Sequence, residues 1–320
     1  MIKFNEEVLS LWKHWIIERN RIYYRKEIEK KKAPWTEDPI LQEFKFTNVK
    51  RWQDRESRWL INNIINNDSL SYEDKIYNCI LFRSWNKGNT FDVICGKGIT
   101  QKDLMNTPTE VFRSRIEEYT AEHPDYVWFT NAFNTGGIKQ TWKYRGRHYN
   151  FNLKNRVEYD DPELNIPLRM IFMIRDCINK DFAEQIKKAK TAKEVYKILL
   201  RIRGCAGFLA YQIYVDLTYI KEFPFSEDEF VVAGPGCKKG ESFLFEDRGG
   251  LNYNEVLFYL RDHQDELFSE YDLNKEFGYL PEENRRLTVM DLENSMCELS
   301  KYCRVFYDSG RPRNKYHYIG

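Results

Sequence analysis

Three consecutive carboxylates, Glu227, Asp228 and Glu229, are the side chains in this sequence best suited by type to do chemistry. A carboxylate can stabilise a developing cation, orient a water molecule, or position and deprotonate an amine. An acidic turn alone is as often a solvated surface feature, so its meaning depends on what precedes it.

A glycine-punctuated segment precedes these carboxylates by about twenty residues. Gly204 and Gly207 separate two helical patterns, and glycine permits the positive φ and the close backbone approach that a tight helical hairpin requires. The second helix would begin with free N–H groups at the positive end of its dipole, which suits a phosphate of the DNA backbone. The segment 191–240 therefore predicts a phosphate-binding hairpin followed by a carboxylate.

Further candidate ligands for DNA lie elsewhere in the chain. Arg19, Arg51, Lys238 and Lys239 could hold phosphates, the last two because they follow a rigid Gly-Pro-Gly turn. Asn48 and Gln212 are amides of the kind that read a pyrimidine edge, and Trp35 could stack on a base or act as a wedge. Each is also compatible with an ordinary structural role.

Composition limits the classes of protein to which the chain can belong. The 320 residues carry 50 Lys and Arg against 49 Asp and Glu, so a nucleic-acid partner would need a local basic face. The seven cysteines show no zinc or iron–sulfur spacing, and we expect neither a metal nor a cofactor. An odd number of cysteines without a signal peptide predicts a cytoplasmic protein, and no apolar run is long enough to span a membrane.

Hydrophobic periodicity predicts a mainly α protein with few short strands. Residues 1–320 are interpreted as a single unit, with two helical lobes around a cleft and a basic tail over 306–320. Residues 141–160 read as a basic, aromatic loop or hairpin near DNA, in which Trp142 and Tyr144 are alternative wedges. Helical patterns cover residues 5–31, 55–66, 71–86, 101–122, 162–179, 181–189, 192–203, 208–219, 252–269 and 283–303.

Six ordered blocks give the sequence a more specific resemblance. They start at Glu18, Pro34, Phe46, Phe208, Ala233 and Cys297, reading ERNRIY, PWTEDPIL, FTNVKR, FLAYQI, AGPGCKKG and CELSKY. Over residues 10–305 the chain resembles the family of the 5-hydroxymethyluracil DNA kinase helical domain. This family is also described as α-glutamyl/putrescinyl thymine pyrophosphorylase, and it looks like a divergent branch of the helix-hairpin-helix DNA glycosylases.

The resemblance implies work on a 5-substituted pyrimidine in double-stranded DNA. Our first hypothesis is a DNA glycosylase that flips and excises a hypermodified base, such as a hydroxymethylated or glucosylated pyrimidine of phage DNA, in a setting of defence against phage. Asp228 would be catalytic, with Glu229 and Glu227 as rivals in register. Glycosylases that also cut the strand carry a lysine where this chain has Leu209, so we expect a monofunctional enzyme that leaves an abasic site.

Two alternatives remain open at this point. A DNA-modifying transferase would place an amino acid or polyamine on 5-phosphomethyl-deoxyuridine in phage DNA, with Asp228 positioning the amine. A non-catalytic module would only bind modified DNA. Although the family is named for a kinase, the sequence contains no GxxxxGK[ST] motif, and so no phosphate-cradling P-loop is expected within it.

Overall fold

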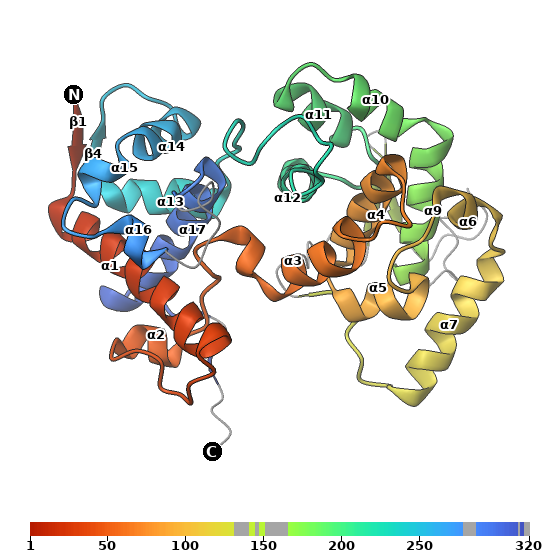
Figure 1. Cartoon of the computed structure of the whole chain (residues 1–320), viewed down its shortest axis with the longest axis horizontal. Coiled ribbons are helices and arrows are strands. Elements are labelled where there is room, and N and C mark those ends of the chain that lie inside the picture. Colours follow the sequence, from red (N-terminus) through yellow and green to blue (C-terminus); the bar gives the residue numbers. More distant parts are fainter. Residues whose placement is uncertain (131–140, 145–146, 151–165, 278–285, 313, 317–320) are drawn as a thin grey trace. The chain divides into compact units, whose positions relative to one another are not determined.

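The structure is a computed structural model that describes residues 1–130, 141–144, 147–150, 166–277, 286–312 and 314–316. Helices dominate these residues, which confirms the mainly α class (Figure 1). The chain divides into two compact units. Unit 1 combines Met1–Asp54 with Glu227–Gly320, and unit 2 is the continuous segment Arg55–Ser226.

Unit 1 is built around its first and last long helices. In α1, Asn5 caps the first turn, and Trp12, Trp15 and Ile16 recur at helical spacing and are fully buried. The strands β1 and β4 pair antiparallel. The elements of unit 1 are β1 (Ile2–Phe4), α1 (Glu6–Tyr23), η1 (Tyr24–Ile28), α2 (Pro39–Glu43), η2 (Arg51–Gln53), α13 (Pro235–Leu244), β4 (Phe245–Arg248), α14 (Tyr253–Asp262), α15 (Gln264–Leu267), α16 (Leu273–Glu276) and α17 (Val289–Phe306).

Helices α13 and α17 pack closely because α13 presents glycine to its neighbour. A Cβ atom at Gly240 would overlap the carbonyl oxygen of Met296, so only glycine fits there. A Cβ at Gly236 would likewise meet the Cys297 thiol. The contact fixes α17 as the central support of unit 1.

Unit 2 surrounds the buried helix α4. This helix begins with a capping box formed by Ser71 and Asp74. Arg83 of α4 forms a fully buried ion pair with Asp216 of α12, and its Nε lies 2.6 Å from Asp216 Oδ2. The elements are α3 (Arg55–Leu60), η3 (Ile61–Ile65), α4 (Tyr72–Trp85), α5 (Gly88–Cys95), α6 (Gln101–Asn106), α7 (Thr109–Glu122), β2 (Thr141–Tyr144), β3 (Arg147–Asn150), α9 (Ile166–Asn179), α10 (Phe182–Lys188), α11 (Ala192–Leu199) and α12 (Gly207–Leu217).

Several helix predictions require correction. The pattern over 252–269 forms two helices, α14 and α15, and the helix predicted over 283–303 begins at Val289. The pattern over 101–122 is not one helix, because Pro108 lacks an N–H and the chain breaks into α6 and α7 at that point. The helix α5 was not predicted at all, since two glycines and a short apolar run conceal its period. No helix in the described part of the chain is long and apolar enough to cross a membrane.

Candidate functional site

The predicted hairpin is present in unit 2. Thr191 caps α11, Gly204 adopts a φ of +76°, and α12 begins at Gly207. Tyr196 packs against Gly207, where a Cβ would lie 2.9 Å from its hydroxyl oxygen. Local geometry thus explains both glycines, and phosphate binding by this turn stays a prediction.

The side chains of Gln212 and Leu209 lie inside unit 2. Both are buried on α12, at 5% and 8% exposure, among the apolar residues that fill the unit. The wedge candidates Trp142 and Tyr144 belong to β2, and their side chains lie outside the described part of the structure.

Asp228 belongs to unit 1, where its side chain contacts the first residue of α17. Its Oδ1 accepts the Val289 N–H at 2.8 Å, and its Oδ2 lies 3.6 Å from Arg261 Nη1. Burial raises the pKa of Asp228, against the opposing effects of the Val289 N–H and Arg261. The neighbouring Glu229 is exposed. A catalytic role for either carboxylate stays a prediction, because the contacts of Asp228 are also those of a helix-capping residue.

The segment 46–54 brings together three of the predicted ligands. Arg19 of α1 donates to the Asn48 side-chain oxygen at 2.5 Å. Arg51 lies in the same segment, where its Nη1 donates to Asp54 at 2.6 Å. Asn294 of α17 donates to the Asn48 carbonyl at 2.9 Å. These residues form a polar network between α1 and α17, which we call the α1–α17 network.

Most polar groups of the α1–α17 network are engaged within the protein. Thr47 donates from its backbone N–H to Glu298 at 3.3 Å and from its hydroxyl to Asn294 at 3.1 Å. Lys50 and Asp291 form a buried ion pair at 3.0 Å. Because a buried charge without a partner is costly, removal of one member of such a pair would destabilise unit 1, and these contacts therefore have a structural role.

The Gly-Pro-Gly turn also has an internal partner. The Gly234 N–H donates to Glu293 Oε1 at 3.1 Å, so a carboxylate already lies at the start of α13. Lys238 and Lys239 are exposed on α13, with Lys238 Nζ 5.3 Å from the Tyr253 ring centroid. They remain available for phosphate, but beside the helix rather than through the Gly234 amide.

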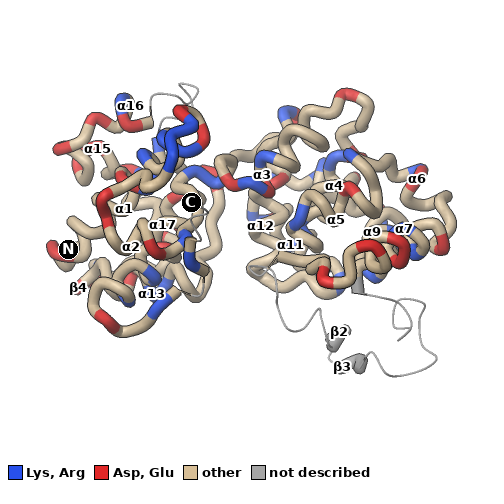
Figure 2. Tube along the Cα trace, turned by 90° about the horizontal axis from the view of Figure 1, so that it is seen from below, with Lys and Arg blue, Asp and Glu red and all other residues tan. Residues whose placement is uncertain are grey.

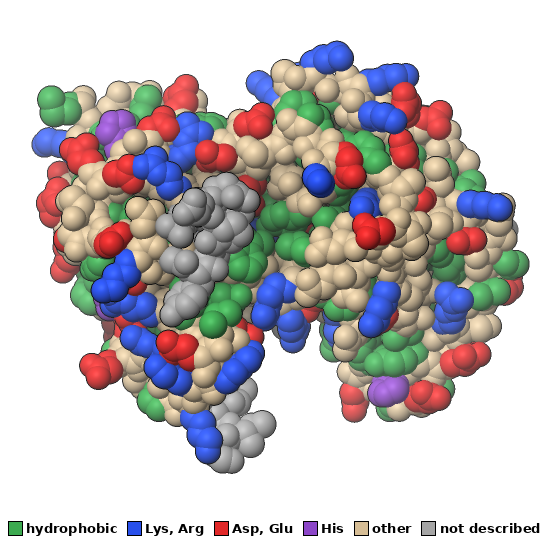
Figure 3. All heavy atoms as spheres, in the orientation of Figure 1, with side chains coloured by type: hydrophobic (Ala, Val, Ile, Leu, Met, Phe, Trp, Pro, Cys, Tyr) green, Lys and Arg blue, Asp and Glu red, His purple; other side chains and the backbone are tan. Residues whose placement is uncertain are grey.

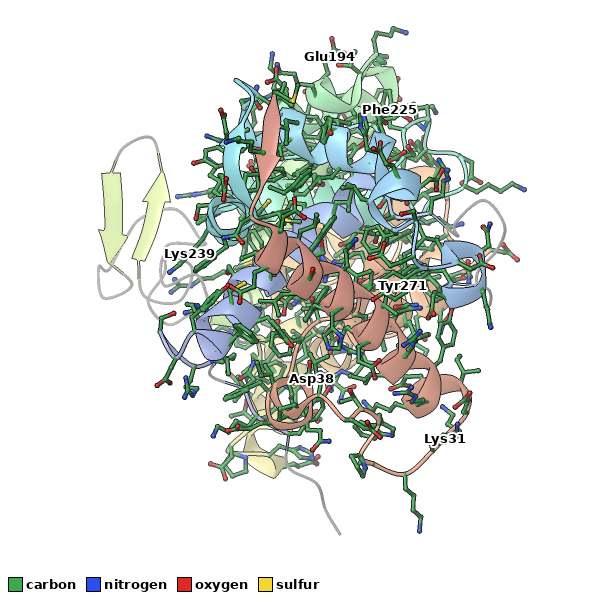
Figure 4. All side chains as sticks on the ribbon, turned by 90° about the vertical axis from the view of Figure 1, so that its left-hand side faces the viewer. Lys31, Asp38, Glu194, Phe225, Lys239 and Tyr271 are labelled. Carbon is green, nitrogen blue, oxygen red and sulfur yellow. The ribbon has the colours of Figure 1, made fainter. Side chains whose placement is uncertain are left out.

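A pocket of about 890 Å³ lies wholly within unit 1 and was not predicted from the sequence. It is formed by α1, the segment 34–42 and the last turns of α17. Figure 4 shows Asp38 below the middle of α1 and Lys31 beyond the end of that helix. The lining residues are His14, Glu18, Arg25, Pro34, Trp35, Thr36, Glu37, Asp38, Pro39, Ile40, Gln42, Tyr302 and Phe306.

Asp38 organises the polar wall of this pocket. Its Oδ1 accepts the N–H groups of Ile40 and Leu41 at the start of α2. Its Oδ2 lies 2.8 Å from His14 Nε2 and accepts the Tyr302 hydroxyl at 2.7 Å. Three separate elements are therefore joined by one carboxylate.

The same contacts determine the protonation of the wall. Burial alone would raise the pKa of Asp38, but the hydrogen bonds from His14, Tyr302 and the Leu41 N–H hold it below its ordinary value. The hydrogen bond to Asp38 raises the pKa of His14 despite partial burial. Burial, followed by the bond to Asp38, raises the pKa of Tyr302, which therefore remains a donor at neutral pH.

Trp35 is the sequence-predicted residue that this pocket does contain. Its indole N–H donates to the Lys31 carbonyl at 2.7 Å, and Arg25 donates to the Trp35 carbonyl at 2.5 Å while pairing with Glu18. Lys26 Nζ lies 5.5 Å from the Trp35 ring centroid. Trp35 is therefore fixed at the pocket, and Asn48, which the sequence grouped with it, does not line that pocket.

Several exposed lysines lie near the pocket, although the chain as a whole is balanced in charge. Along both units Lys and Arg alternate with Asp and Glu (Figure 2). On the face of unit 1 in Figure 3, however, Lys and Arg side chains are frequent over α1 and α2. Five exposed lysines flank the segment that carries Trp35, and we call them the lysine rim. They are Lys26, Lys30, Lys31, Lys32 and Lys45.

Sequence signals for the pocket existed but were weak. Asp38-Pro39 is an N-cap followed by proline at the first helical position, which predicts a helix start but no site. His14 is a lone histidine on the exposed side of an amphipathic helix. Only the fold reveals that these residues and Tyr302 meet. In the part of the chain that the structure describes, no three His, Cys, Asp or Glu side chains gather as a metal site.

Comparison with known proteins assigns the chain to a family. The sequence model of the family described as "5-hmdU DNA kinase, helical domain" matches residues 6–311, which is nearly the entire chain. The chain therefore belongs to this family.

Two curated proteins are similar in sequence. The "5-hmdU DNA kinase" of Bacillus phage SP10 is 27% identical over 301 residues, which cover 91% of this chain and 44% of that protein. The "Nonsense-mediated decay protein 4" of Candida albicans is 30% identical over 168 residues, or 48% of this chain and 41% of that protein. The chain thus spans less than half the length of these relatives. No solved structure matches it significantly.

These findings overturn the glycosylase hypothesis. The family and its phage member are named for a DNA kinase, a phosphotransferase that leaves the bond between base and sugar intact, whereas a glycosylase hydrolyses that bond. Base excision and membership of the hydrolases are therefore wrong predictions. The transferase alternative is closer because it also moves a group onto the base, but it names an amine rather than a phosphoryl group.

Proposed function

We propose that this chain is the DNA-recognition part of a kinase that phosphorylates 5-hydroxymethyl-2′-deoxyuridine in DNA. The observation that carries the proposal is the family match over residues 6–311, together with the similarity to a phage protein named as a 5-hmdU DNA kinase. Five of the six sequence blocks typical of the family lie in unit 1, where three of them line the pocket.

The residues of this chain fit recognition of DNA better than binding and activation of a nucleoside triphosphate. Phosphoryl transfer from a nucleoside triphosphate usually requires a backbone cradle for the phosphates and a lysine beside them. The sequence has no P-loop motif, and the phage kinase is more than twice as long as the part this chain matches. We infer that the nucleotide-binding part of the kinase is separate from these residues.

Each unit would contribute its own phosphate contacts to DNA binding. The hairpin between α11 and α12 offers backbone amides to a phosphate, and the lysine rim of unit 1 offers side-chain charges. The finer likeness to helix-hairpin-helix glycosylases supports the first of these contacts and stays part of the proposal. Because such contacts ignore base sequence, selectivity must come from groups that touch the modified base.

A label-transfer experiment tests this assignment. The purified chain is incubated with a duplex that carries 5-hydroxymethyl-deoxyuridine, with magnesium and γ-labelled ATP, and the digested DNA is analysed by mass spectrometry. We expect selective retention of the modified duplex on a filter, with no label on the DNA. Label transferred by the chain alone would show that the nucleotide site lies within it. Equal retention of modified and unmodified duplexes would overturn the proposal.

A further inference from the structure

The pocket of unit 1 presents an aromatic wall fixed at both ends. The Trp35 indole is tied to the Lys31 carbonyl, and its backbone is tied to Arg25. Phe306, which is 46% exposed, also lines the pocket. A flat ring can stack on such surfaces whatever its sequence context, and stacking is how proteins hold bases that have left the duplex.

The polar wall presents an oriented imidazole. Both oxygens of Asp38 are engaged, one by the start of α2 and the other by His14 Nε2 and the Tyr302 hydroxyl. Asp38 therefore fixes the orientation of the His14 ring through one nitrogen. The other nitrogen, Nδ1, has no hydrogen-bond partner among the described residues. An imidazole held in this way can exchange a hydrogen bond with a ligand hydroxyl.

We propose that this pocket takes the 5-hydroxymethyluracil base of a nucleotide turned out of the duplex, and that His14 recognises its hydroxyl group. The base stacks on Trp35 and the hydroxyl meets His14 Nδ1. This assignment rests on the proposed function and adds the place and the atom of recognition. Thymine lacks that hydroxyl and leaves the imidazole nitrogen without its partner.

The charges around the pocket favour a nucleotide over a free amine. Glu18 is engaged by Arg25, and Asp38 by His14, so only the exposed Glu37 among the three carboxylates of the pocket lining forms no ion pair within the described residues. Lys30, Lys32 and Lys45 are exposed and form no ion pair within the described residues, which suits the phosphates on either side of an extruded nucleotide.

The test compares two duplexes that differ at one position, 5-hydroxymethyl-deoxyuridine or thymidine, by fluorescence anisotropy with the whole chain. The variants are His14→Ala, Asp38→Asn and Trp35→Ala. Asparagine retains the helix cap that Asp38 provides but weakens the hold on His14. His263→Ala is the matched control, because His263 is a partly exposed histidine of unit 1 that does not line the pocket. Circular dichroism checks that each variant folds.

We expect His14→Ala to reduce the preference for the modified duplex by roughly five- to tenfold, the loss typical of one hydrogen bond. Asp38→Asn should reduce it less. Trp35→Ala should weaken binding of both duplexes by roughly tenfold or more, since stacking does not depend on the hydroxyl. His263→Ala should change neither quantity.

The failure of this assignment is distinguishable from failure of the proposed function. If the wild-type chain prefers the modified duplex and His14→Ala and Trp35→Ala retain that preference and affinity, the base binds elsewhere. If the wild-type chain shows no preference, the proposed function itself fails. A Trp35→Ala variant that loses only the preference would also overturn the arrangement, because stacking would then not be its role.

Discussion

At the scale of single residues, this chain uses buried carboxyl groups in two opposite ways. Asp38 is charged and holds donors from three elements, which lowers its pKa. Glu241 of α13 and Glu293 of α17 are buried, and burial raises the pKa of each to about 7. The charged Asp38 orients the polar groups of the pocket wall, whereas Glu293 and Glu241 make the stability of unit 1 depend on pH.

The pH dependence has a definite sign. A carboxyl whose pKa rises from 4.5 in the unfolded chain to about 7 in the folded chain binds more protons when folded between those values. The free energy of unfolding therefore falls as the pH rises through that range. From pH 6 to pH 8 we expect Glu293 to contribute a loss of about 1 kcal/mol.

Glu293→Gln should remove that contribution. The glutamine remains an acceptor for the Gly234 N–H and is neutral at every pH, so the variant should be the more stable protein at pH 8. Urea unfolding at pH 6 and pH 8 measures the difference. Glu246→Gln, a substitution of an exposed carboxylate on β4, serves as the control. An unchanged pH dependence in Glu293→Gln would contradict the explanation.

Candidate functional residues could be identified from the sequence more readily than the residues that contact them in the structure. The sequence identified Arg19, Asn48, Arg51 and Trp35 as notable, and the structure places the first three in one network. It could not reveal that most polar groups of the network have partners within the protein, or that His14, Asp38 and Tyr302 meet. Those contacts join residues 24 and 264 positions apart, which no local pattern encodes.

At the scale of elements, amphipathic spacing predicted α1, α4 and α11, and a short apolar run predicted α12, although α4 and α12 are buried on nearly all sides. The break at Pro108 and the short helix α5 were missed, since a single proline and two glycines outweigh periodicity over so few residues. The close packing of α13 on α17 was equally invisible, because it depends on which face Gly240 presents.

Gly240→Ala tests that packing. Alanine favours helix by about 1 kcal/mol over glycine, so propensity alone would stabilise the variant. The overlap with the Met296 carbonyl should instead destabilise it by about 2 kcal/mol or more, since the opposing atom is backbone. Thermal unfolding followed by circular dichroism gives the sign. Ser242→Ala, at an exposed position of α13, should be close to neutral. A stabilised Gly240→Ala protein would show that the two helices can separate without cost.

At the scale of the whole molecule, a balanced chain can still bind DNA if its charge is local. A net charge of +1 provides little general attraction, so affinity must come from particular cations such as those of the lysine rim. Each lysine that contacts a phosphate contributes about one unit to the dependence of log Kd on log salt concentration.

The double variant Lys32→Ala/Lys45→Ala should therefore reduce that salt slope by about two and weaken binding to modified and unmodified duplexes alike. Lys97→Ala/Lys102→Ala is the matched control, with two exposed lysines of unit 2 that form no ion pair within the described residues. Anisotropy titrations at several salt concentrations give both slopes. Equal slopes for the two double variants would exclude the lysine rim as a DNA contact.

The central claim is that the chain recognises 5-hydroxymethyl-deoxyuridine in DNA, and the most direct measurement is the ratio of two dissociation constants. Two duplexes of the same sequence, one with 5-hydroxymethyl-deoxyuridine and one with thymidine at a single position, compete for the wild-type chain at physiological salt. We predict a preference for the modified duplex of roughly tenfold, the discrimination that one additional hydrogen bond provides. A ratio of one would contradict the account.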